Sequence, residues 1–217
     1  MSKSILIADD HQLVRKGLQL VIREVLGFNS HVEFAENGTQ VLEKLKAKKF
    51  DLLLTDLSMP ETDELGMITN ALSTSPGLKI LVITVKPDKV FATRFFKAGV
   101  MGYVNKSESD YVLSEAISVI SQGRRYISHS QIELFTNALI KNALDSPFDK
   151  LSNREFEVTL MLLKGFGAIE IAKSLSISAS TASTFRCRIF SKLEINNLLE
   201  LNHLAQQYQI PVDFENG

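Results

Sequence analysis

Four of the predicted strands in the first half of the chain end at side chains that could do chemistry. In chain order these side chains are Asp9, Asp10, Asp56, Thr84 and Lys106. Because ligands of open parallel sheets bind beyond the carboxyl ends of the strands, we expect these groups to converge at one edge. Clustered carboxylates repel one another unless a cation neutralises them, and oxygen ligands of this kind suit Mg²⁺. A carboxylate nucleophile beside a hard cation, a lysine and a hydroxyl could hold an acyl phosphate.

The Asp9-Asp10 pair has a simpler interpretation by itself, as a helix N-cap that complements the helix dipole. Such a cap explains two neighbouring acids at the end of one strand. It does not explain five chemically suited residues at the ends of four predicted strands, so we favour a shared site.

Over residues 1–123 the spacing of the apolar residues alternates between the pattern of a strand and the pattern of a helix. Short apolar runs predict five strands: Ser4–Ala8, His31–Ala35, Leu52–Thr55, Lys79–Val85 and Gly102–Val104. Apolar residues at helical spacing predict five helices: Gln12–Leu26, one marked by Val41, Leu42 and Leu45, Leu65–Leu72, Val90–Ala98 and Tyr111–Ile120. This alternation predicts a doubly wound α/β fold with a parallel five-stranded sheet covered on both faces.

The rest of the chain has a helical pattern throughout. Residues 124–147 are interpreted as a linker that contains a predicted helix, Ile132–Leu144. In the last segment, 148–217, a capping box of Ser152 and Glu155 starts one helix, and three more are predicted: Ala168–Leu175, Ala179–Leu193 and Asn197–Gln207. A helix, a short helix, a tight turn and a longer helix form the order of a helix-turn-helix motif. By pattern alone, a small helical bundle that only dimerises explains these helices equally well.

Composition excludes several classes of protein. The chain has 217 residues, 45% of them hydrophobic, and a formal charge of −1, which excludes whole-chain disorder and argues against bulk electrostatic coating of nucleic acid or membrane. No apolar run is long enough for a transmembrane helix, and the run at Ile5 turns acidic too soon for a signal peptide. With Cys187 as the only cysteine, no intrachain disulfide can form, which is typical of the reducing cytoplasm.

The first segment, 1–123, resembles the receiver domain of bacterial two-component response regulators. The matching strings are ILIADDH (Ile5–His11), DLLLTDLSMP (Asp51–Pro60), VIT (Val82–Thr84) and AGVMGYVNK (Ala98–Lys106). The resemblance implies a flavodoxin-like fold in which Asp56 is the phosphoacceptor and receives a phosphoryl group from a sensor histidine kinase. It also implies Mg²⁺ ligation by Asp10, Asp56 and the backbone carbonyl of Ser58, with Asp9 acting through water.

Three further receiver residues have roles by the same resemblance. Lys106 would pair with the phosphoryl group, Thr84 would swing toward it, and Tyr103 would move inward in step. Together they form a two-state element that is biased by one new charged group. Tyr103 has a second interpretation as a half-buried aromatic on an edge strand, but its position three residues before Lys106 favours the switch.

The receiver segment departs from the family pattern at two positions beside the site. Val85 follows Thr84 where the family usually has a small residue, so its branched side chain is expected to crowd the phosphoryl pocket. The family places a glycine four residues after the proline, whereas this sequence has Glu64 there and Gly66 two residues later. The loop after Pro60 is therefore expected to differ in geometry.

The last segment, 148–217, resembles the LuxR-type (NarL/FixJ-like) helix-turn-helix domain over Leu151–Ala205. The matching strings are LSNRE from Leu151, EIA from Glu170, SAST from Ser178 and KL from Lys192. In such a motif the second helix lies in the major groove. The resemblance implies binding to double-stranded DNA by a homodimer that pairs through the last helix. The alternative is that the last helix packs only on its own domain.

The predicted recognition helix, Ala179–Leu193, has two sides. The side expected to face the core carries Ala182, Phe185, Ile189 and Leu193. DNA contacts are assigned to Thr181, Ser183, Thr184, Cys187, Arg188 and Lys192. Arg188 and Lys192 lie one helical turn apart and could clamp phosphates, whereas Ser and Thr discriminate bases weakly. Each basic residue could also be an ordinary surface charge, and Cys187 could be an inert thiol.

The last segment is poor in positive charge for a DNA-binding domain. Residues 148–217 carry 7 basic and 8 acidic residues, so DNA contact must depend on one helix face around Arg188 and Lys192. The leading interpretation is a response regulator, not an enzyme, that is phosphorylated on Asp56 and binds DNA to regulate transcription. The alternative is a receiver-controlled interaction or dimerisation module that binds DNA weakly or not at all. A phosphatase with an aspartyl nucleophile is a third possibility, which the receiver-like spacing of the site disfavours.

Overall fold

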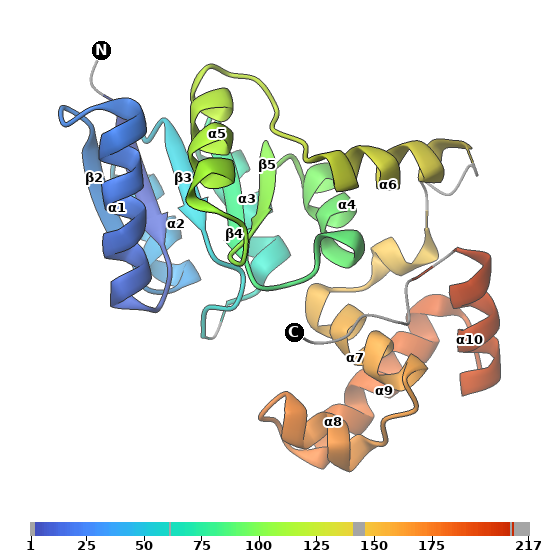
Figure 1. Cartoon of the computed structure of the whole chain (residues 1–217). Helices are drawn as coiled ribbons and strands as arrows, with labels where there is room; N and C mark the ends of the chain where they lie inside the picture. Colours follow the sequence, from blue (N-terminus) through green and yellow to red (C-terminus); the bar gives the residue numbers. More distant parts are fainter. Residues whose placement is uncertain (1–2, 61, 141–145, 209, 211–217) are drawn as a thin grey trace. The chain divides into compact units, whose positions relative to one another are not determined.

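The computed structural model describes residues 3–60, 62–140, 146–208 and 210, and the chain divides into two units. The first unit comprises residues 1–134 and the second residues 135–217. In Figure 1 the first unit is a sheet between helices, and the second is a group of helices. The predicted order of an α/β fold followed by a helical domain is confirmed.

Five parallel strands form the sheet of the first unit in the order β2-β1-β3-β4-β5. The strands are β1 (Ser4–Ala8), β2 (His31–Ala35), β3 (Leu52–Thr55), β4 (Lys79–Thr84) and β5 (Gly102–Asn105). After β2 the chain crosses to the opposite side of β1, so the strand order reverses between β1 and β3. Open sheets bind their ligands at the carboxyl ends of the strands beside such a reversal.

Helices cover both faces of this sheet. On one face α1 (Gln12–Leu26) packs beside α5 (Asp110–Ser121), and on the other lie α2 (Gly38–Ala47), α3 (Glu64–Thr74) and α4 (Asp88–Ala98). Because strand residues alternate between the faces, apolar side chains of every strand are buried on both. The core under α1 and α5 includes Ile5, Ile7, Leu18, Ile22, Leu54 and Ile117.

The ends of these elements follow local sequence signals. α1 ends at Gly27, whose φ of 87° lies in the region that favours glycine. Side chains of Asn37, Asp63 and Ser109 accept hydrogen bonds from backbone N–H groups and start α2, α3 and α5. The predicted strand Lys79–Val85 is one residue too long, because β4 ends at Thr84 and Val85 lies in the following loop.

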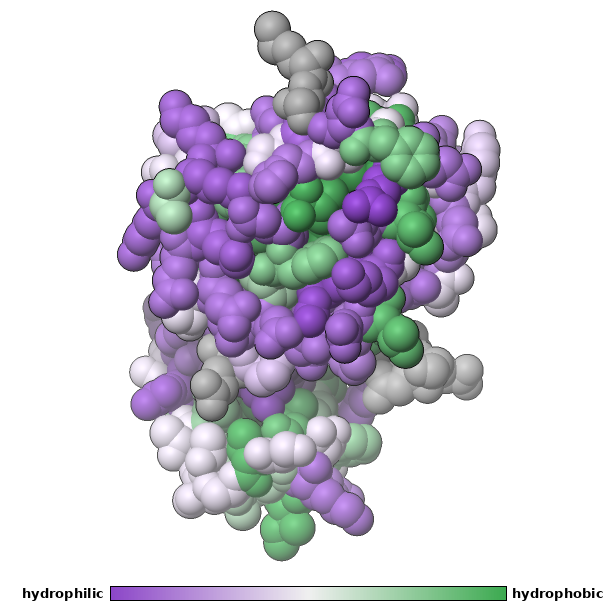
Figure 2. All heavy atoms as spheres, turned by 90° about the vertical axis from the view of Figure 1, so that its left-hand side faces the viewer, coloured by the Kyte–Doolittle hydropathy of each residue, from purple (hydrophilic) through white to green (hydrophobic). Residues whose placement is uncertain are grey.

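Charged side chains protect the edge strand β2. Figure 2 looks onto this side of the first unit, where α1, β2 and α2 lie, and most of its surface is hydrophilic. Glu33 of β2 pairs with Lys44 at 2.9 Å and with Lys48, and Nζ of Lys16 lies 5.2 Å from the ring centroid of Phe34. The bonds to Lys48 and Lys44 lower the pKa of Glu33 to about 2. Charges of this kind oppose edge-to-edge pairing with another sheet.

The opposite edge of the sheet is covered by the segment that follows α5. The backbone N–H of Tyr126 donates to the carbonyl of Met101 at 2.8 Å, directly before β5. α6 (His129–Ile140) then begins three residues earlier than the predicted helix Ile132–Leu144. Residues 141–145, at the predicted end of that helix, lie outside the described residues.

The second unit contains a 3₁₀ helix η1 (Pro147–Lys150) and the helices α7 (Asn153–Leu163), α8 (Ala168–Ser174), α9 (Ala179–Leu193) and α10 (Leu198–Gln207). The predicted capping box is present, since Ser152 Oγ accepts from the N–H of Glu155 and Glu155 Oε2 accepts from the N–H of Ser152. Phe148 is buried and lies edge-on to Phe156 and Tyr208, with ring centroids 6.4 and 6.5 Å away. α8 packs against α9, as a helix-turn-helix requires. Across the part of the chain described, no helix has both the length and the apolar character needed to cross a bilayer.

Gly102 occupies a position in β5 where a side chain has no room. A Cβ atom there would lie 2.7 Å from Cδ1 of Ile120 and 3.0 Å from Cδ1 of Leu81. We therefore expect Gly102→Ala to lower the free energy of unfolding by about 1–3 kcal/mol. The matched control is Gly17→Ala, because a Cβ atom on Gly17 meets no atom within 4 Å, and this change should stabilise α1 by about 1 kcal/mol. Urea unfolding of both variants measures the difference, and equal midpoints would contradict the packing described for β5.

Candidate functional site

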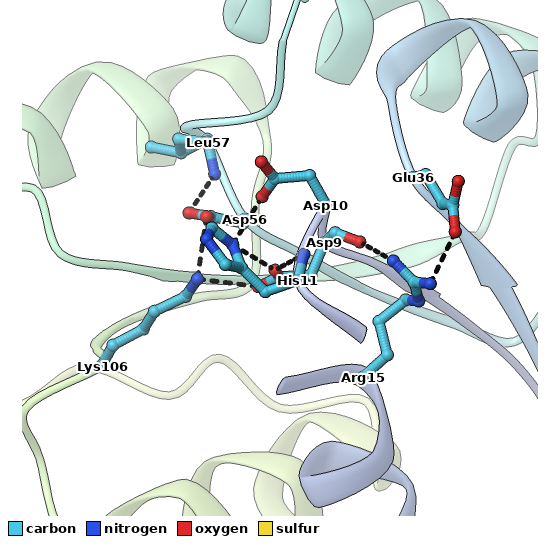
Figure 3. A network of polar contacts seen from close by, with 8 residues as sticks. All are labelled: Asp9, Asp10, His11, Arg15, Glu36, Asp56, Leu57 and Lys106. Atoms are coloured by element: carbon cyan, nitrogen blue, oxygen red, sulfur yellow. Dashed lines mark hydrogen bonds and ion pairs between the residues drawn. The ribbon is translucent and has the colours of Figure 1, made fainter. Parts of the chain in front are cut away.

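The acidic groups predicted at the carboxyl edge of the sheet do converge (Figure 3). Asp9 follows β1 and Asp56 follows β3, and both are buried, with 1% and 4% of their surface exposed. Nζ of Lys106 lies between them, 2.7 Å from Oδ2 of Asp9 and 2.8 Å from Oδ2 of Asp56. One ammonium group therefore bridges two buried carboxylates that belong to different strands.

Lys106 keeps its charge in this position. Burial by itself lowers the pKa of the ammonium, but the hydrogen bonds to Asp56 and Asp9 outweigh burial and raise the pKa above its ordinary value. Removing charges from water is costly unless they are paired with good geometry, and both carboxylates meet that condition through the same partner. A negatively charged group added to Asp56 would thus meet a cation that is already in place.

The backbone around the site fixes the orientation of both carboxylates. Oδ1 of Asp56 accepts a hydrogen bond from the N–H of Leu57 at 2.6 Å, and Oδ1 of Asp9 accepts one from the N–H of His11 at 2.8 Å. In each carboxylate, one oxygen accepts from a backbone N–H group and the other accepts from Lys106. The carboxylates are therefore oriented before any ligand arrives.

A buried arginine that the sequence analysis did not identify supports the end of β1. Nη1 of Arg15 donates to the carbonyl of Asp9 at 2.7 Å, and its Nη2 pairs with Glu36 at 2.6 Å. Arg15 lies on α1 and Glu36 follows β2, so this pair depends on how two separate elements pack. Arg15 thereby fixes the backbone of Asp9, and it lies on the other side of Asp9 from Lys106.

Asp10 completes an acidic pocket whose donor set fits a divalent cation. Ligand atoms of Asp9, Asp10 and His11 lie within 4.8 Å of one another. Oδ1 of Asp10 is buried and accepts no hydrogen bond, and it is paired with Nδ1 of His11 at 2.7 Å. A hard cation such as Mg²⁺ would give this buried oxygen a further favourable contact. His11 was not among the predicted site residues.

Thr84 and Tyr103 lie on neighbouring strands and are both fully buried. The interpretation of Tyr103 as a half-buried aromatic is therefore wrong, since its ring packs against Phe95 with 6.0 Å between centroids. The Tyr103 hydroxyl donates to the carbonyl of Lys86 at 2.9 Å, and the N–H of Lys86 donates to Oγ1 of Thr84 at 3.4 Å. Burial first, and then nearby carboxylates, raise the pKa of Tyr103 well above its ordinary value, so the phenol keeps its proton.

The two departures from the family pattern lie at the start of the loop after β4 and at the start of α3. Val85 is 65% exposed in the loop after β4, and its expected effect on the phosphoryl pocket stays a prediction. Glu64 opens α3, and its carboxylate forms an ion pair with Lys86 in the loop after β4. Ser58, predicted to offer its carbonyl to the cation, is exposed in the loop after β3.

The start of α6 is bonded to these switch elements, a connection that the sequence analysis missed. Gln131 is 2% exposed, and its Nε2 donates to the carbonyl of Tyr103 at 2.8 Å. Oγ of Ser130 donates to Oδ2 of Asp88 at 2.9 Å, at the first residue of α4. The first turn of α6 is therefore hydrogen-bonded to both β5 and α4. The sequence did contain one signal for the start of this helix: Ser128, whose Oγ accepts from the N–H of Gln131 three residues later.

The side chains predicted to contact DNA share the exposed side of α9. Exposed residues are Thr181, Ser183, Thr184, Cys187, Arg188 and Lys192, and buried ones are Ala182, Ile189 and Leu193. Phe185, expected in the core, is only half-buried. Its side chain helps to line an open hollow together with Ser180, Thr181, Thr184 and Arg188.

The two basic residues of the predicted phosphate clamp differ in their surroundings. Nζ of Lys192 lies 2.6 Å from Oε2 of Glu155, whose side chain is 5% exposed, so this lysine joins α9 to α7. Burial raises the pKa of Glu155, but the bonds from Lys192 and Ser152 outweigh it and lower the pKa below its ordinary value. Arg188 makes no ion pair with any residue that the structure describes, and its guanidinium faces solvent beside the hollow.

The first unit has the topology and the acidic edge of a receiver, and the second has the helix order of a DNA-binding output domain. Comparisons with known proteins agree with this class. The family model described as response regulator receiver domain matches residues 5–118, and that described as bacterial regulatory proteins, luxR family, matches residues 149–205. The chain belongs to the two-component response regulators that carry a LuxR-type DNA-binding domain.

Similar proteins cover almost the whole chain. The response regulator UvrY of Escherichia coli O6:H1 is 32% identical over 203 residues, which are 93% of each chain. The response regulator GacA of Pseudomonas protegens is 33% identical over 204 residues, which are 94% of this chain and 95% of GacA. RcsB of Salmonella enterica serovar Typhimurium, solved on promoter rprA with the phosphomimetic BeF3−, has a TM-score of 0.57 at 26% identity and covers 95% of this chain and 99% of its own. These relatives are regulators rather than enzymes, as expected for this chain.

Removing the ammonium of Lys106 tests the electrostatics of the pocket. We expect Lys106→Met to lower the free energy of unfolding by about 2–4 kcal/mol in EDTA, because Asp9 and Asp56 lose their shared counter-ion. Added Mg²⁺ should stabilise the variant more than the wild type, since a bound cation replaces the missing charge. Urea unfolding in EDTA and in Mg²⁺ measures both effects. Lys46→Met, at an exposed position of α2, is the control, and a Lys106 variant as stable as this control in EDTA would contradict the prediction.

Proposed function

We propose that this protein is a cytoplasmic response regulator in which Asp56 accepts a phosphoryl group from a sensor histidine kinase and thereby controls DNA binding. The observation that carries this proposal is the buried carboxylate of Asp56 at the switch point of the sheet, bonded to Lys106 and next to an acidic pocket. Receiver domains bind Mg²⁺ at such a pocket, here formed around Asp9 and Asp10.

The proposed reaction uses Asp56 as the nucleophile. A carboxylate oxygen attacks phosphorus, an O–P bond forms, and the P–N bond of the phosphohistidine breaks, which returns the electron pair to the imidazole. Lys106 would follow the negative charge onto the phosphoryl oxygens. Asp10, Asp56 and the Ser58 carbonyl would hold Mg²⁺, with Asp9 acting through water, and the bound cation would neutralise charge on the transferring group.

We further propose a path for the signal within the first unit. Thr84 would turn toward the phosphoryl group, and Tyr103 would be held inward in step. The Tyr103 hydroxyl donates to the loop after β4, and the Tyr103 carbonyl accepts a hydrogen bond from Gln131. The position of Tyr103 is therefore coupled to α6. A packing change around this strand would therefore reach the helix that leads to the second unit.

Three functional segments follow from this proposal. Residues 1–123 are the phosphoacceptor receiver, residues 124–147 are the linker, and residues 148–217 are the DNA-binding domain. α6 starts within the linker, and its first turn is bonded to the receiver. The linker is thus the element on which the state of the receiver would act.

DNA contact is proposed for the exposed side of α9, by analogy with RcsB, which has been solved on promoter DNA. Thr181, Ser183, Thr184 and Cys187 would face the bases, and Arg188 and Lys192 the phosphates. Because Lys192 also holds Glu155, Arg188 is the stronger candidate for a phosphate contact. Leu199 is 80% exposed on α10, the helix through which we propose that two copies pair on DNA.

A second candidate function has its own support. The side of the second unit around α8 exposes two large apolar side chains, with Ile169 77% and Phe166 40% exposed. Such residues favour contact with a protein over contact with a phosphate backbone. In this alternative the second unit is a receiver-controlled interaction or dimerisation module.

The phosphoacceptor assignment predicts a single labelled residue. With Mg²⁺ and acetyl phosphate, the wild type should gain one phosphoryl group and Asp56→Ala none, because no other carboxylate among the described residues has the same contacts with Lys106 and Leu57. Asp110→Asn, at an exposed position of α5, is the control and should be labelled like the wild type. Intact-mass spectrometry reads the result. Equal labelling of Asp56→Ala and wild type would show that the assignment is wrong.

The DNA-binding proposal predicts a specific salt effect. In gel shifts on its own promoter region, Arg188→Ala should weaken binding across sequences and reduce the slope of log K against log salt by about one, as the loss of one phosphate contact does. Arg125→Ala, an exposed arginine outside the second unit, should leave the slope unchanged. If neither the phosphorylated nor the unphosphorylated protein shifts this DNA specifically, the interaction module is the better explanation.

A further inference from the structure

A largely buried ion pair joins the loop after β4 to the start of α3. Lys86, in the loop between β4 and α4, pairs through Nζ with the carboxylate of Glu64, the first residue of α3. Their side chains are only 13% and 12% exposed. The same ammonium lies 5.4 Å from the ring centroid of Phe91 in α4. Charges in such a setting are screened weakly by solvent, so the pair ties the loop firmly to the start of α3.

The backbone of Lys86 contacts both residues of the proposed switch. Its carbonyl accepts from the Tyr103 hydroxyl at 2.9 Å, and its N–H donates to Oγ1 of Thr84 at 3.4 Å. The Tyr103 ring is fully buried when it makes this bond, so the bond favours the inward position of the ring. One residue therefore links Glu64, through its side chain, to Tyr103 and Thr84, through its backbone.

We propose that Glu64 and Lys86 are positioning residues, which hold the loop after β4 in the conformation that accepts an inward Tyr103. Glu64 stands where the family pattern has glycine, and glycine has no side chain with which to make the pair. The bias is therefore a property of this sequence rather than of the receiver fold. The proposal rests on the proposed role of Tyr103, and it implies that the ion pair biases the equilibrium on which phosphorylation would act toward the inward state.

Removing the charge of Glu64 shows how the pair would act. Without the carboxylate of Glu64, the burial of the Lys86 ammonium beside Phe91 is less well compensated, and exposure of the ammonium to water becomes more favourable. Movement of Lys86 toward solvent would turn its carbonyl away from the Tyr103 hydroxyl. A buried hydroxyl without a partner is costly, so Tyr103 would then sample an outward rotamer.

Fluorine NMR of the full chain labelled with 3-fluorotyrosine measures this equilibrium directly. The chain has four tyrosines, and Tyr103→Phe identifies the resonance of Tyr103 by its loss. Without a phosphoryl donor, we expect one buried-ring resonance in the wild type. In Glu64→Gln a second, solvent-exposed resonance should appear, with the outward-to-inward ratio raised by at least about tenfold. Beryllofluoride with Mg²⁺ should return the variant to the inward resonance.

Controls separate a positioning role from a general loss of stability. Exchanging the charges in the double variant Glu64→Lys with Lys86→Glu should restore the inward resonance, and Glu43→Gln, an exposed glutamate of α2, should leave it unchanged. Lys86→Met provides a second way to remove the pair if Glu64→Gln does not fold. A wild-type resonance in both Glu64→Gln and Lys86→Met would overturn the proposal. If these variants move Tyr103 but beryllofluoride moves it in none of the proteins, the pair is supported and the proposed switch is rejected.

Discussion

An ammonium group held between two buried carboxylates is the interaction on which the first unit depends. Lys106 follows β5, whereas Asp9 follows β1 and Asp56 follows β3. Their contact therefore joins the carboxyl ends of three strands of the sheet. None of these charges would be stable there alone, because transfer from water is costly without a partner. The same groups therefore stabilise the fold and form the pocket that we propose for a cation and a phosphoryl group. Any ligand that changes the charge at Asp56 must redistribute the contacts of Lys106, and this requirement connects chemistry to conformation.

From that edge, buried polar contacts lead outward through neighbouring elements. Tyr103 is central, because its hydroxyl reaches the loop after β4 while its carbonyl reaches Gln131 of α6. The ion pair of Glu64 and Lys86 adds a fixed point to this route on the side of α3. A change to the second arrangement that we propose would break hydrogen bonds of buried groups. A local change in charge could therefore favour one arrangement over the other.

In the second unit, basic residues divide between structural and exposed roles. Lys192 holds the buried Glu155 of the capping box, and Arg154 donates to the carbonyl of Leu175 at 2.7 Å and pairs with Glu157. These contacts stabilise the packing of α7 against the rest of the unit. Two exposed arginines remain near the centre of α9: Arg188, which lines the hollow, and Arg186, whose guanidinium lies 5.2 Å from the ring centroid of Phe190. A count of basic residues therefore overstates the positive charge that this domain can offer to DNA.

Sequence alone determined the elements and the identity of the site. Strands β1, β2 and β3 and helices α1 and α9 have the bounds that their apolar periods predict, because periodicity, capping residues and glycine act locally. Parallel topology then brings the strand ends together, so the convergence of Asp9, Asp56 and Lys106 was also predictable. Only the tertiary structure decided which side chains pair over long separations: Arg15 with Glu36, Lys86 with Glu64, Gln131 with Tyr103, and Lys192 with Glu155. Such pairs depend on how elements pack and on which rotamers fit between them, and no local pattern of residues encodes either.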